Sequence, residues 1–256
     1  IQRFPESTLA EDIQYRIGEA LFGREKYAES LEVFLRFIVD HTKSPRVPNA
    51  QYYVAVCQEE LGRREEAVIQ ARAFVRNYPQ HELAAEMLFR QAANEFQLGD
   101  WEAAAEHFAA CGETYELETY RPRAWYNAAV AYEKLQRPNQ AVHYYRRLVE
   151  AYPEDPNAAA SWQRLVLLLS GQGEDDAAEE ALGALRAAAG TEAWQKVLIT
   201  LSATYQQAGD EDRQVRVLSR LMEGPGRTSE SYALGLIELA AVYEGRKNWR
   251  EALRVY

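Results

Sequence analysis

Histidine and cysteine are the side chains of this sequence that could bind a transition metal, and one pair has a suitable spacing. His107 and Cys111 are four residues apart, so both would lie on one face of a helix. The other histidines are dispersed, and a zinc site usually needs four ligands. A free cysteine also packs well as a small buried side chain. We therefore expect no metal site, and we interpret Cys111 as a core residue.

A cluster of carboxylates is the second feature that could do chemistry. It comprises Glu174, Asp175, Asp176, Glu179 and Glu180. Carboxylates can bind Ca²⁺, but the spacing of an EF-hand loop is missing. Negative side chains also stabilise the first turn of a helix through the helix dipole. We favour this structural interpretation over cation binding.

Catalytic motifs are missing from the sequence. It contains no nucleophile elbow of the Gly-x-Ser-x-Gly type, no glycine-rich phosphate loop and no His-Glu-x-x-His pattern. We expect neither enzymatic activity nor a cofactor. The 29 basic and 39 acidic residues give a net charge of −10, which disfavours nucleic acid as a partner. The longest purely aliphatic stretch, residues 165–169, is far shorter than the roughly twenty residues of a membrane span.

A repeat with a period near 37 residues organises the chain. Segments such as Leu61-Gly62-Arg63 and Leu98-Gly99-Asp100 separate amphipathic stretches of about a dozen residues. Successive turn positions are 37, 37, 37, 37, 36 and 38 residues apart. They are Glu25, Gly62, Gly99, Gln136, Gly173, Gly209 and Lys247. Each unit is therefore predicted to be a helix, a short turn and a second helix.

Small side chains recur at fixed distances from each turn. Seven residues before it stand Gly18, Ala55, Ala92, Ala129, Val166, Ser202 and Ala240. Five residues after it stand Ser30, Ala67, Ala104, Ala141, Ala178, Gln214 and Ala252. Small residues at both positions would let the two helices of a unit approach closely. We also interpret the tryptophans at repeated positions, Trp101 with Trp249 and Trp125 with Trp162, as core residues.

This pattern resembles the tetratricopeptide repeat family, whose units have about 34 residues. The resemblance implies an all-α, right-handed superhelical solenoid of helix–turn–helix repeats in one domain, residues 1–256. The predicted repeats are 11–47, 48–84, 85–121, 122–158, 159–194, 195–231 and a truncated 232–256, with residues 1–10 the remnant of an earlier repeat. The additional residues lie at junctions such as Tyr78-Pro79 and Tyr152-Pro153. These junctions are similar to those of bacterial envelope proteins of the family, namely the periplasmic Tol-associated coordinator and the lipoprotein of the outer-membrane barrel-assembly machine.

The resemblance also indicates where a partner would bind. In this family the first helices line a concave groove. The groove positions fall here on Tyr15, Arg16, Tyr52, Tyr53, Phe89, Arg90, Tyr126, Asn127 and Arg164. Tyrosine and arginine are enriched at binding hot spots, so the column would suit a protein or peptide. The alternative is that individual rings pack between neighbouring first helices.

The sequence therefore predicts a protein-interaction scaffold that binds a protein or peptide in the groove, without a membrane-spanning helix. The resemblance favours a bacterial cell-envelope assembly or transport complex, and a periplasmic or outer-membrane-associated location over a cytoplasmic one. Two alternatives remain open. One is a structural array that associates with itself, and the other is a regulatory region of a larger enzyme.

Overall fold

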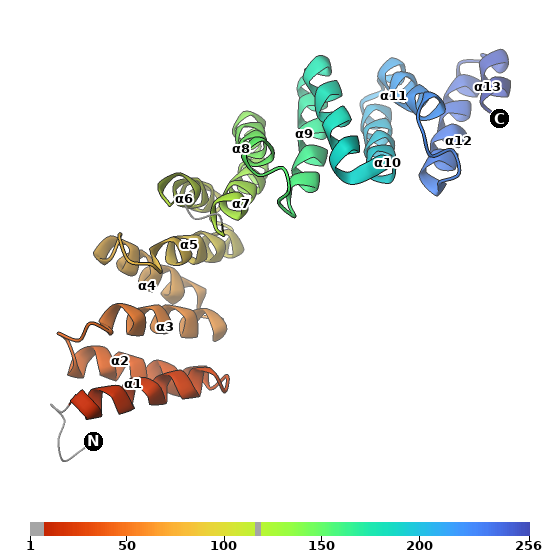
Figure 1. The fold of residues 1–256 in the computed structure, drawn as a ribbon. Helices are drawn as coiled ribbons and strands as arrows, with labels where there is room; N and C mark the ends of the chain where they lie inside the picture. Colours follow the sequence, from red (N-terminus) through yellow and green to blue (C-terminus); the bar gives the residue numbers. More distant parts are fainter. Residues whose placement is uncertain (1–7, 116–118) are drawn as a thin grey trace. The chain divides into compact units, whose positions relative to one another are not determined.

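The computed structural model describes residues 8–115 and 119–256, and these residues form helices without β-strands. The predicted all-α repeat architecture is confirmed (Figure 1). The chain divides into two compact units, Ile1–Tyr144 and Tyr145–Tyr256, here called the N-terminal and C-terminal units. The helices are α1 (Thr8–Phe22), α2 (Tyr27–Asp40), α3 (Val47–Glu60), α4 (Arg64–Asn77), α5 (Ala84–Leu98), α6 (Trp101–Thr114), α7 (Arg121–Lys134), α8 (Pro138–Ala151), α9 (Ala158–Gln172), α10 (Asp175–Ala208), α11 (Glu211–Glu223), α12 (Glu230–Gly245) and α13 (Trp249–Val255).

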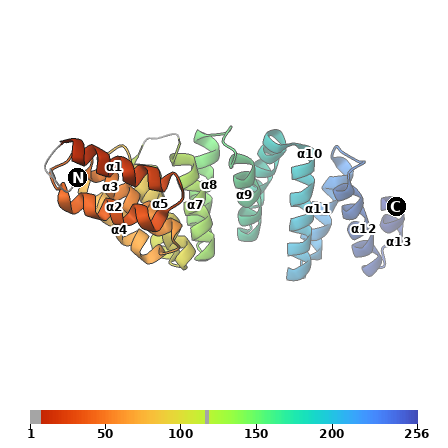
Figure 2. The ribbon, with the colours of Figure 1, turned by 90° about the horizontal axis from the view of Figure 1, so that it is seen from below.

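Each unit is a stack of helices in chain order. In the N-terminal unit the first helices of the repeats are α1, α3, α5 and α7, and the second helices α2, α4 and α6 lie between them in the sequence. In the C-terminal unit α9 to α13 stand side by side (Figure 2). The predicted remnant of an earlier repeat, residues 1–10, falls mostly on residues 1–7, which lie outside the described part of the chain. Residues 8–10 form the beginning of α1.

The predicted turn positions all adopt the left-handed backbone conformation. Their φ angles lie between 56° at Gln136 and 83° at Gly99. At the third turn the Gly99 amide donates to the Phe96 carbonyl over 3.1 Å, and the Asp100 amide donates to the Glu95 carbonyl over 3.0 Å. This pair of bonds defines a Schellman motif, which satisfies the last carbonyls of a helix and reverses the chain. The same pair of bonds closes the other six turns.

The small residues before and after each turn are buried, as the sequence predicts. A methyl group on Gly18 would lie 2.6 Å from Cζ of Phe34, so glycine is required at that contact. The two polar departures from the alanine column are also accommodated. The Ser30 hydroxyl donates to the Gly18 carbonyl over 2.9 Å, and the Gln214 amide donates to the Ser202 hydroxyl over 3.3 Å. A buried polar side chain with such a partner keeps its hydrogen bond on folding.

The junctions between repeats end one helix and begin the next. Proline occupies the first turn of α3 and α7, where its missing N–H leaves no hydrogen bond unmade. The junction between the fifth and sixth repeats differs, because α10 consists of two helical segments that meet directly at Gly190, whose backbone is non-helical (φ 81°, ψ −179°). Only glycine adopts this combination of angles without strain.

The tryptophan interpretation is correct for Trp125 and wrong for two others. Trp125 is buried, with 4% of its surface exposed. Trp101 and Trp249 are 38% and 60% exposed, because each is the first residue of a second helix, directly after the turn, where few neighbours cover it. Trp162 is half-buried. Among the described residues, no helix is long and apolar enough to cross a lipid bilayer.

Candidate functional site

The predicted site residues lie on the first helices of the repeats. Eight of them belong to the N-terminal unit, in pairs on α1, α3, α5 and α7, and Arg164 lies on α9 of the C-terminal unit. We call the surface of α1, α3, α5 and α7 that carries these pairs the first-helix face. Tyr126 and Asn127 are half-buried on α7, and Arg164 is exposed.

Tyr15 is a core side chain, with only 7% of its surface exposed. Its ring makes edge contacts with Phe34 and Phe37, at centroid distances of 5.5 and 5.4 Å. Tyr53 of the next repeat stacks on Phe34 at 4.6 Å, nearly parallel. Tyr15 and much of Tyr53 therefore pack in the core, and these contacts are to the second helix α2 rather than between neighbouring first helices.

Next to Tyr15 the surface is hollowed between α1 and α3. The hollow, of about 300 Å³, is lined by Tyr15, Arg16, Glu19, Arg46 and Asn49. The Arg46 guanidinium lies 5.2 Å from the centre of the Tyr15 ring. This hollow therefore presents an aromatic edge, two guanidinium groups, a carboxylate and an amide within one small surface.

Asp12 holds the two arginines of this hollow in place. It accepts hydrogen bonds from Nη1 of Arg46 over 2.8 Å and from Nε of Arg16 over 2.9 Å. These bonds, that from Arg46 foremost, lower the pKa of Asp12 below its ordinary value. The carboxylate is thus ionised at neutral pH and orients both guanidinium groups.

A polar network links α3 and α5 one repeat further along. The Tyr52 hydroxyl donates to Oε1 of Glu86 over 2.8 Å. Arg90 donates from Nε to the same Glu86 oxygen over 2.9 Å and from Nη1 to Glu59 over 3.1 Å. The Arg90 guanidinium also lies 5.9 Å from the centre of the Tyr52 ring. One arginine therefore joins two carboxylates and one aromatic ring.

The pKa values in this network favour a fixed set of charges. Burial and the bond to Glu86 raise the pKa of Tyr52 to about 12, so its hydroxyl stays protonated and can donate. Burial opposes the charge of Glu86, but bonds from Arg90 and Tyr52 outweigh it and lower the pKa of that carboxyl. Burial likewise opposes the charge of Arg90, yet Glu86 and Glu59 raise the pKa of the guanidinium.

A third aromatic ring, that of Phe89 on α5, also has an arginine over it, supplied by α7. It contacts Phe108 at 5.2 Å and Tyr120 at 5.9 Å. The Arg123 guanidinium lies 4.9 Å from its centre. An arginine at the end of the same repeat, Arg46, or from the following repeat, Arg90 and Arg123, therefore lies over the ring in three successive repeats. This is a favourable cation–π arrangement.

Two of these arginines were not predicted from the sequence. Arg46 follows Tyr15 by 31 residues, Arg90 follows Tyr52 by 38, and Arg123 follows Phe89 by 34. A search at a fixed period compares equivalent positions, so it finds the ring column but not partners at varying offsets. The signal that could find them is an arginine roughly one period after each aromatic residue.

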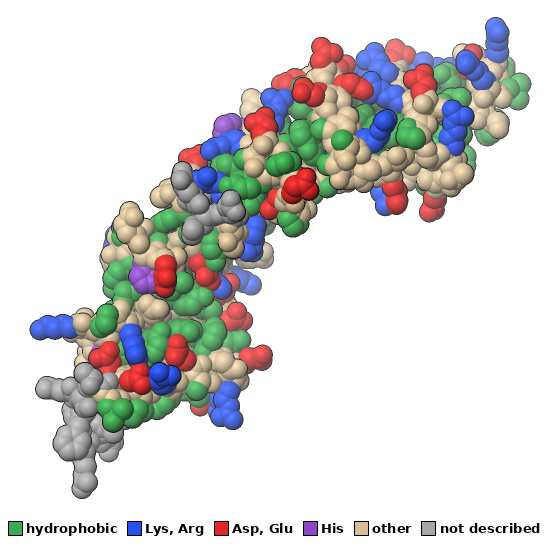
Figure 3. Space-filling model, in the orientation of Figure 1, with side chains coloured by type: hydrophobic (Ala, Val, Ile, Leu, Met, Phe, Trp, Pro, Cys, Tyr) green, Lys and Arg blue, Asp and Glu red, His purple; other side chains and the backbone are tan. Residues whose placement is uncertain are grey.

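The other candidate chemistry has structural explanations. His107 Nδ1 lies 2.6 Å from Glu95, and the Cys111 thiol donates to the Ala85 carbonyl over 3.4 Å. Among the described residues, no group of three or more His, Cys, Asp or Glu side chains could hold a metal ion. In the acidic cluster, Asp175 pairs with Arg216, and Glu179 pairs with Arg220. Acidic and basic side chains likewise lie next to one another on the visible face of each unit (Figure 3).

Comparisons with known proteins agree with this architecture. Two family profiles described as tetratricopeptide repeat match residues 15–82 and 122–155. No curated protein sequence matches the chain significantly.

Solved structures show the same fold at low sequence identity. A tetratricopeptide repeat protein from Parabacteroides merdae has a TM-score of 0.59 and 13% identity, over 96% of this chain and 98% of that one. MamA from Desulfovibrio magneticus has a TM-score of 0.54 and 16% identity, over 70% of this chain and 94% of that one. Pseudomonas aeruginosa PilF has a TM-score of 0.52 and 15% identity, over 90% of this chain and 97% of that one.

Proposed function

Because this chain is a tetratricopeptide repeat protein, we propose that it is a protein-interaction scaffold whose first-helix face binds a peptide segment of a partner. Tetratricopeptide repeats generally bind protein partners. The observation that carries the proposal here is the Tyr52–Glu86–Arg90–Glu59 network. It keeps charged and aromatic groups partly exposed in a fixed arrangement on helices rather than on loops.

Preorganisation is the physical reason to place binding at this network. Side chains of Arg90, Glu59 and Glu86 are 28%, 25% and 20% exposed, so they are restrained but still reach solvent. A partner that contacts them need not order long flexible side chains, which otherwise costs affinity. Arg90 has five N–H groups, and the two ion pairs use two of them. The remaining donors and the Tyr52 ring are available to the backbone or an aromatic side chain of a peptide.

The cell-envelope context is a further proposal. It rests on the junctions that contain an aromatic residue followed by proline, as at Tyr78-Pro79. We propose that the chain works in a bacterial envelope assembly or transport complex, in the periplasm or at the outer membrane. Fractionation of cells that express the tagged natural protein tests this location, and recovery of the protein only in the cytoplasm would contradict it.

Binding by peptides selected on the immobilised chain tests the main proposal. We expect Tyr52→Ala and Arg90→Ala to weaken a selected peptide about tenfold each, the loss typical of a hot-spot residue. Ile69→Ala is the matched control, because Ile69 is 60% exposed on the second helix α4. Equal binding by wild type and both site variants, with helical circular dichroism intact, would contradict the proposal.

Self-association is a second candidate function, favoured by the apolar surface of α1. Ile13 and Ile17 are 38% and 42% exposed, whereas the equivalent residues one period later, Ala50 and Val54, are buried at 0% and 1%. Leu253 on α13 is 77% exposed, although its equivalents Leu31 and Val68 are buried. We propose that a second copy covers these surfaces. Sedimentation velocity tests this, since a monomer at every concentration would exclude it and Ile17→Glu should dissociate any oligomer.

A further inference from the structure

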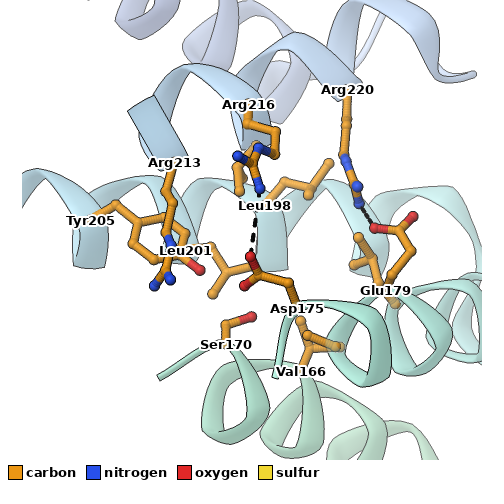
Figure 4. Close-up of a pocket in the computed structure, with 13 residues that line it drawn as sticks. Val166, Ser170, Asp175, Glu179, Leu198, Leu201, Tyr205, Arg213, Arg216 and Arg220 are labelled. Atoms are coloured by element: carbon orange, nitrogen blue, oxygen red, sulfur yellow. Dashed lines mark hydrogen bonds and ion pairs between the residues drawn. The ribbon is translucent and has the colours of Figure 1, made fainter. Parts of the chain in front are cut away.

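A cleft in the C-terminal unit is lined by residues that do not belong to the first-helix face, among them the ion-paired carboxylates of the acidic cluster. It is a narrow cavity of about 60 Å³ lined by the end of α9, by both parts of α10 on either side of Gly190, and by α11 (Figure 4). Leu182, Leu198 and Leu201 line its apolar part, and all three are buried. Arg213, Arg216 and Arg220 from α11 line its rim. An apolar floor under three guanidinium groups suits a ligand that is both apolar and anionic.

The three arginines occupy one side of α11, at spacings of three and four residues. Arg216 and Arg220 reach across the cleft to Asp175 and Glu179 of α10 (Figure 4). Arg213 lies 5.7 Å from the centre of the Tyr205 ring, and its Nε is 3.5 Å from Asp210. Within the described residues, its Nη1 and Nη2 atoms have no hydrogen-bond partner. Arg213 can therefore bind an anion without giving up an existing bond from these two atoms.

This row of arginines is a departure from the repeat. At the positions equivalent to Arg213, Arg216 and Arg220 the second repeat has Glu66, Ile69 and Ala73. No other repeat has arginine at more than one of the three positions.

The same repeat departs from the pattern in two further ways. It has the only glutamine in the small-residue column, Gln214, and the 36-residue spacing that accompanies the kink at Gly190. Local departures from an otherwise regular design are expected where a protein carries function.

We propose that this cleft binds a short acidic peptide segment that carries an apolar side chain beside its carboxylates. The carboxylates bind Arg213 and the neighbouring guanidinium groups, whose planar forks match carboxylate geometry. The apolar side chain covers the buried leucines of the floor. This site is separate from the first-helix face of the N-terminal unit and does not depend on that proposal.

The carboxylates already in the cleft make the proposal specific. Arg216 and Asp175 are 62% and 46% exposed and 3.5 Å apart, so their ion pair is weak and exchangeable. A peptide carboxylate can replace Asp175 at Arg216 while Asp175 turns to solvent. Removing the charge of Asp175 should therefore strengthen peptide binding. If the arginines only hold α11 against α10, that substitution has no such effect.

Fluorescence anisotropy with a labelled peptide, Gly-Glu-Leu-Glu-Glu-Leu-Gly, tests the proposal on the whole chain at low salt. We expect saturable binding, about tenfold weaker for Arg213→Ala and about threefold tighter for Asp175→Asn, the sizes expected for one charge-assisted contact. Arg250→Ala removes an exposed positive charge of α13 and should leave binding unchanged. Circular dichroism monitors folding, and the gain of binding by Asp175→Asn cannot result from unfolding.

Three results would overturn the proposal. The first is the absence of saturable binding by the wild-type chain. The second is equal binding of a peptide with glutamine in place of glutamate, or with serine in place of leucine. The third is equal weakening by Arg250→Ala and Arg213→Ala, which would indicate general attraction of anions to the surface.

Discussion

Replacing Gln136 with glycine should stabilise the chain, because Gln136 occupies a left-handed turn position with φ of 56°. Its side chain is exposed and makes no hydrogen bond within the described residues. The substitution therefore changes the backbone preference and little else. Four of the seven turns already have glycine at this position.

The magnitude follows from two opposing contributions. A side chain in the left-handed conformation costs about 1–2 kcal/mol, which glycine avoids. Glycine in turn loses about 0.5–1 kcal/mol more conformational entropy on folding. We expect Gln136→Gly to raise the free energy of unfolding by about 0.5–1 kcal/mol. For a chain of this size the melting temperature should rise by about 2 °C.

Thermal and urea unfolding, followed by circular dichroism, measure this difference. Gly99→Ala is the reciprocal variant and should destabilise the chain by a similar amount, because Gly99 has φ of 83° and open space around it. Gly183→Ala is the matched control. Gly183 is exposed within helix α10 and also has no neighbour within 4 Å, so alanine there should stabilise. If Gly99→Ala and Gly183→Ala both stabilised the chain, left-handed turns would not govern the repeat.

Three further predictions concern the core. Gly18→Ala should destabilise the chain by about 1–3 kcal/mol in urea unfolding, because the added methyl group meets the Phe34 ring, and an unchanged midpoint would show that the ring moves freely. The bond to Glu95 raises the pKa of His107, whereas bonds from His107 and Gln91 outweigh burial and lower the pKa of Glu95. The contribution of this pair to the free energy of unfolding is thus complete between about pH 4.5 and 6.5. It falls at higher pH as His107 deprotonates and at lower pH as Glu95 protonates. His107→Gln should therefore flatten the alkaline part of a plot of unfolding free energy against pH. Burial raises the pKa of the Cys111 thiol to about 12, so a thiol reagent at pH 8 should modify Cys111 only after unfolding, and rapid native modification would contradict its burial.

The repeat architecture was predictable because its determinants are local. Each turn needs one left-handed residue, and each helix pair needs small residues at fixed distances from it, so both appear as periodic columns. The exposed positions of Trp101 and Trp249 were missed, because a repeated position shows that a residue has a constant environment but not that the environment is buried.

The candidate site was predictable only in part, for a related reason. The aromatic column of Tyr52 and Phe89 follows the period, whereas Arg46 comes from the end of the repeat that holds Tyr15, and Arg123 from the repeat after Phe89. Their placement over the rings depends on how two repeats pack. The cleft beside Arg213 arises in the same way, from four helix segments that the sequence shows one at a time.

Hydrogen–deuterium exchange of the chain with and without a selected peptide tests the central claim most directly. Backbone amides of the bound face should be slowed when the peptide covers and rigidifies it. We expect added protection in α3 (Val47–Glu60) and α5 (Ala84–Leu98), which carry Tyr52 and Arg90, and little change in the intervening second helix α4 (Arg64–Asn77). Protection confined to α4, with α3 and α5 unchanged, would contradict the assignment of partner binding to the first-helix face.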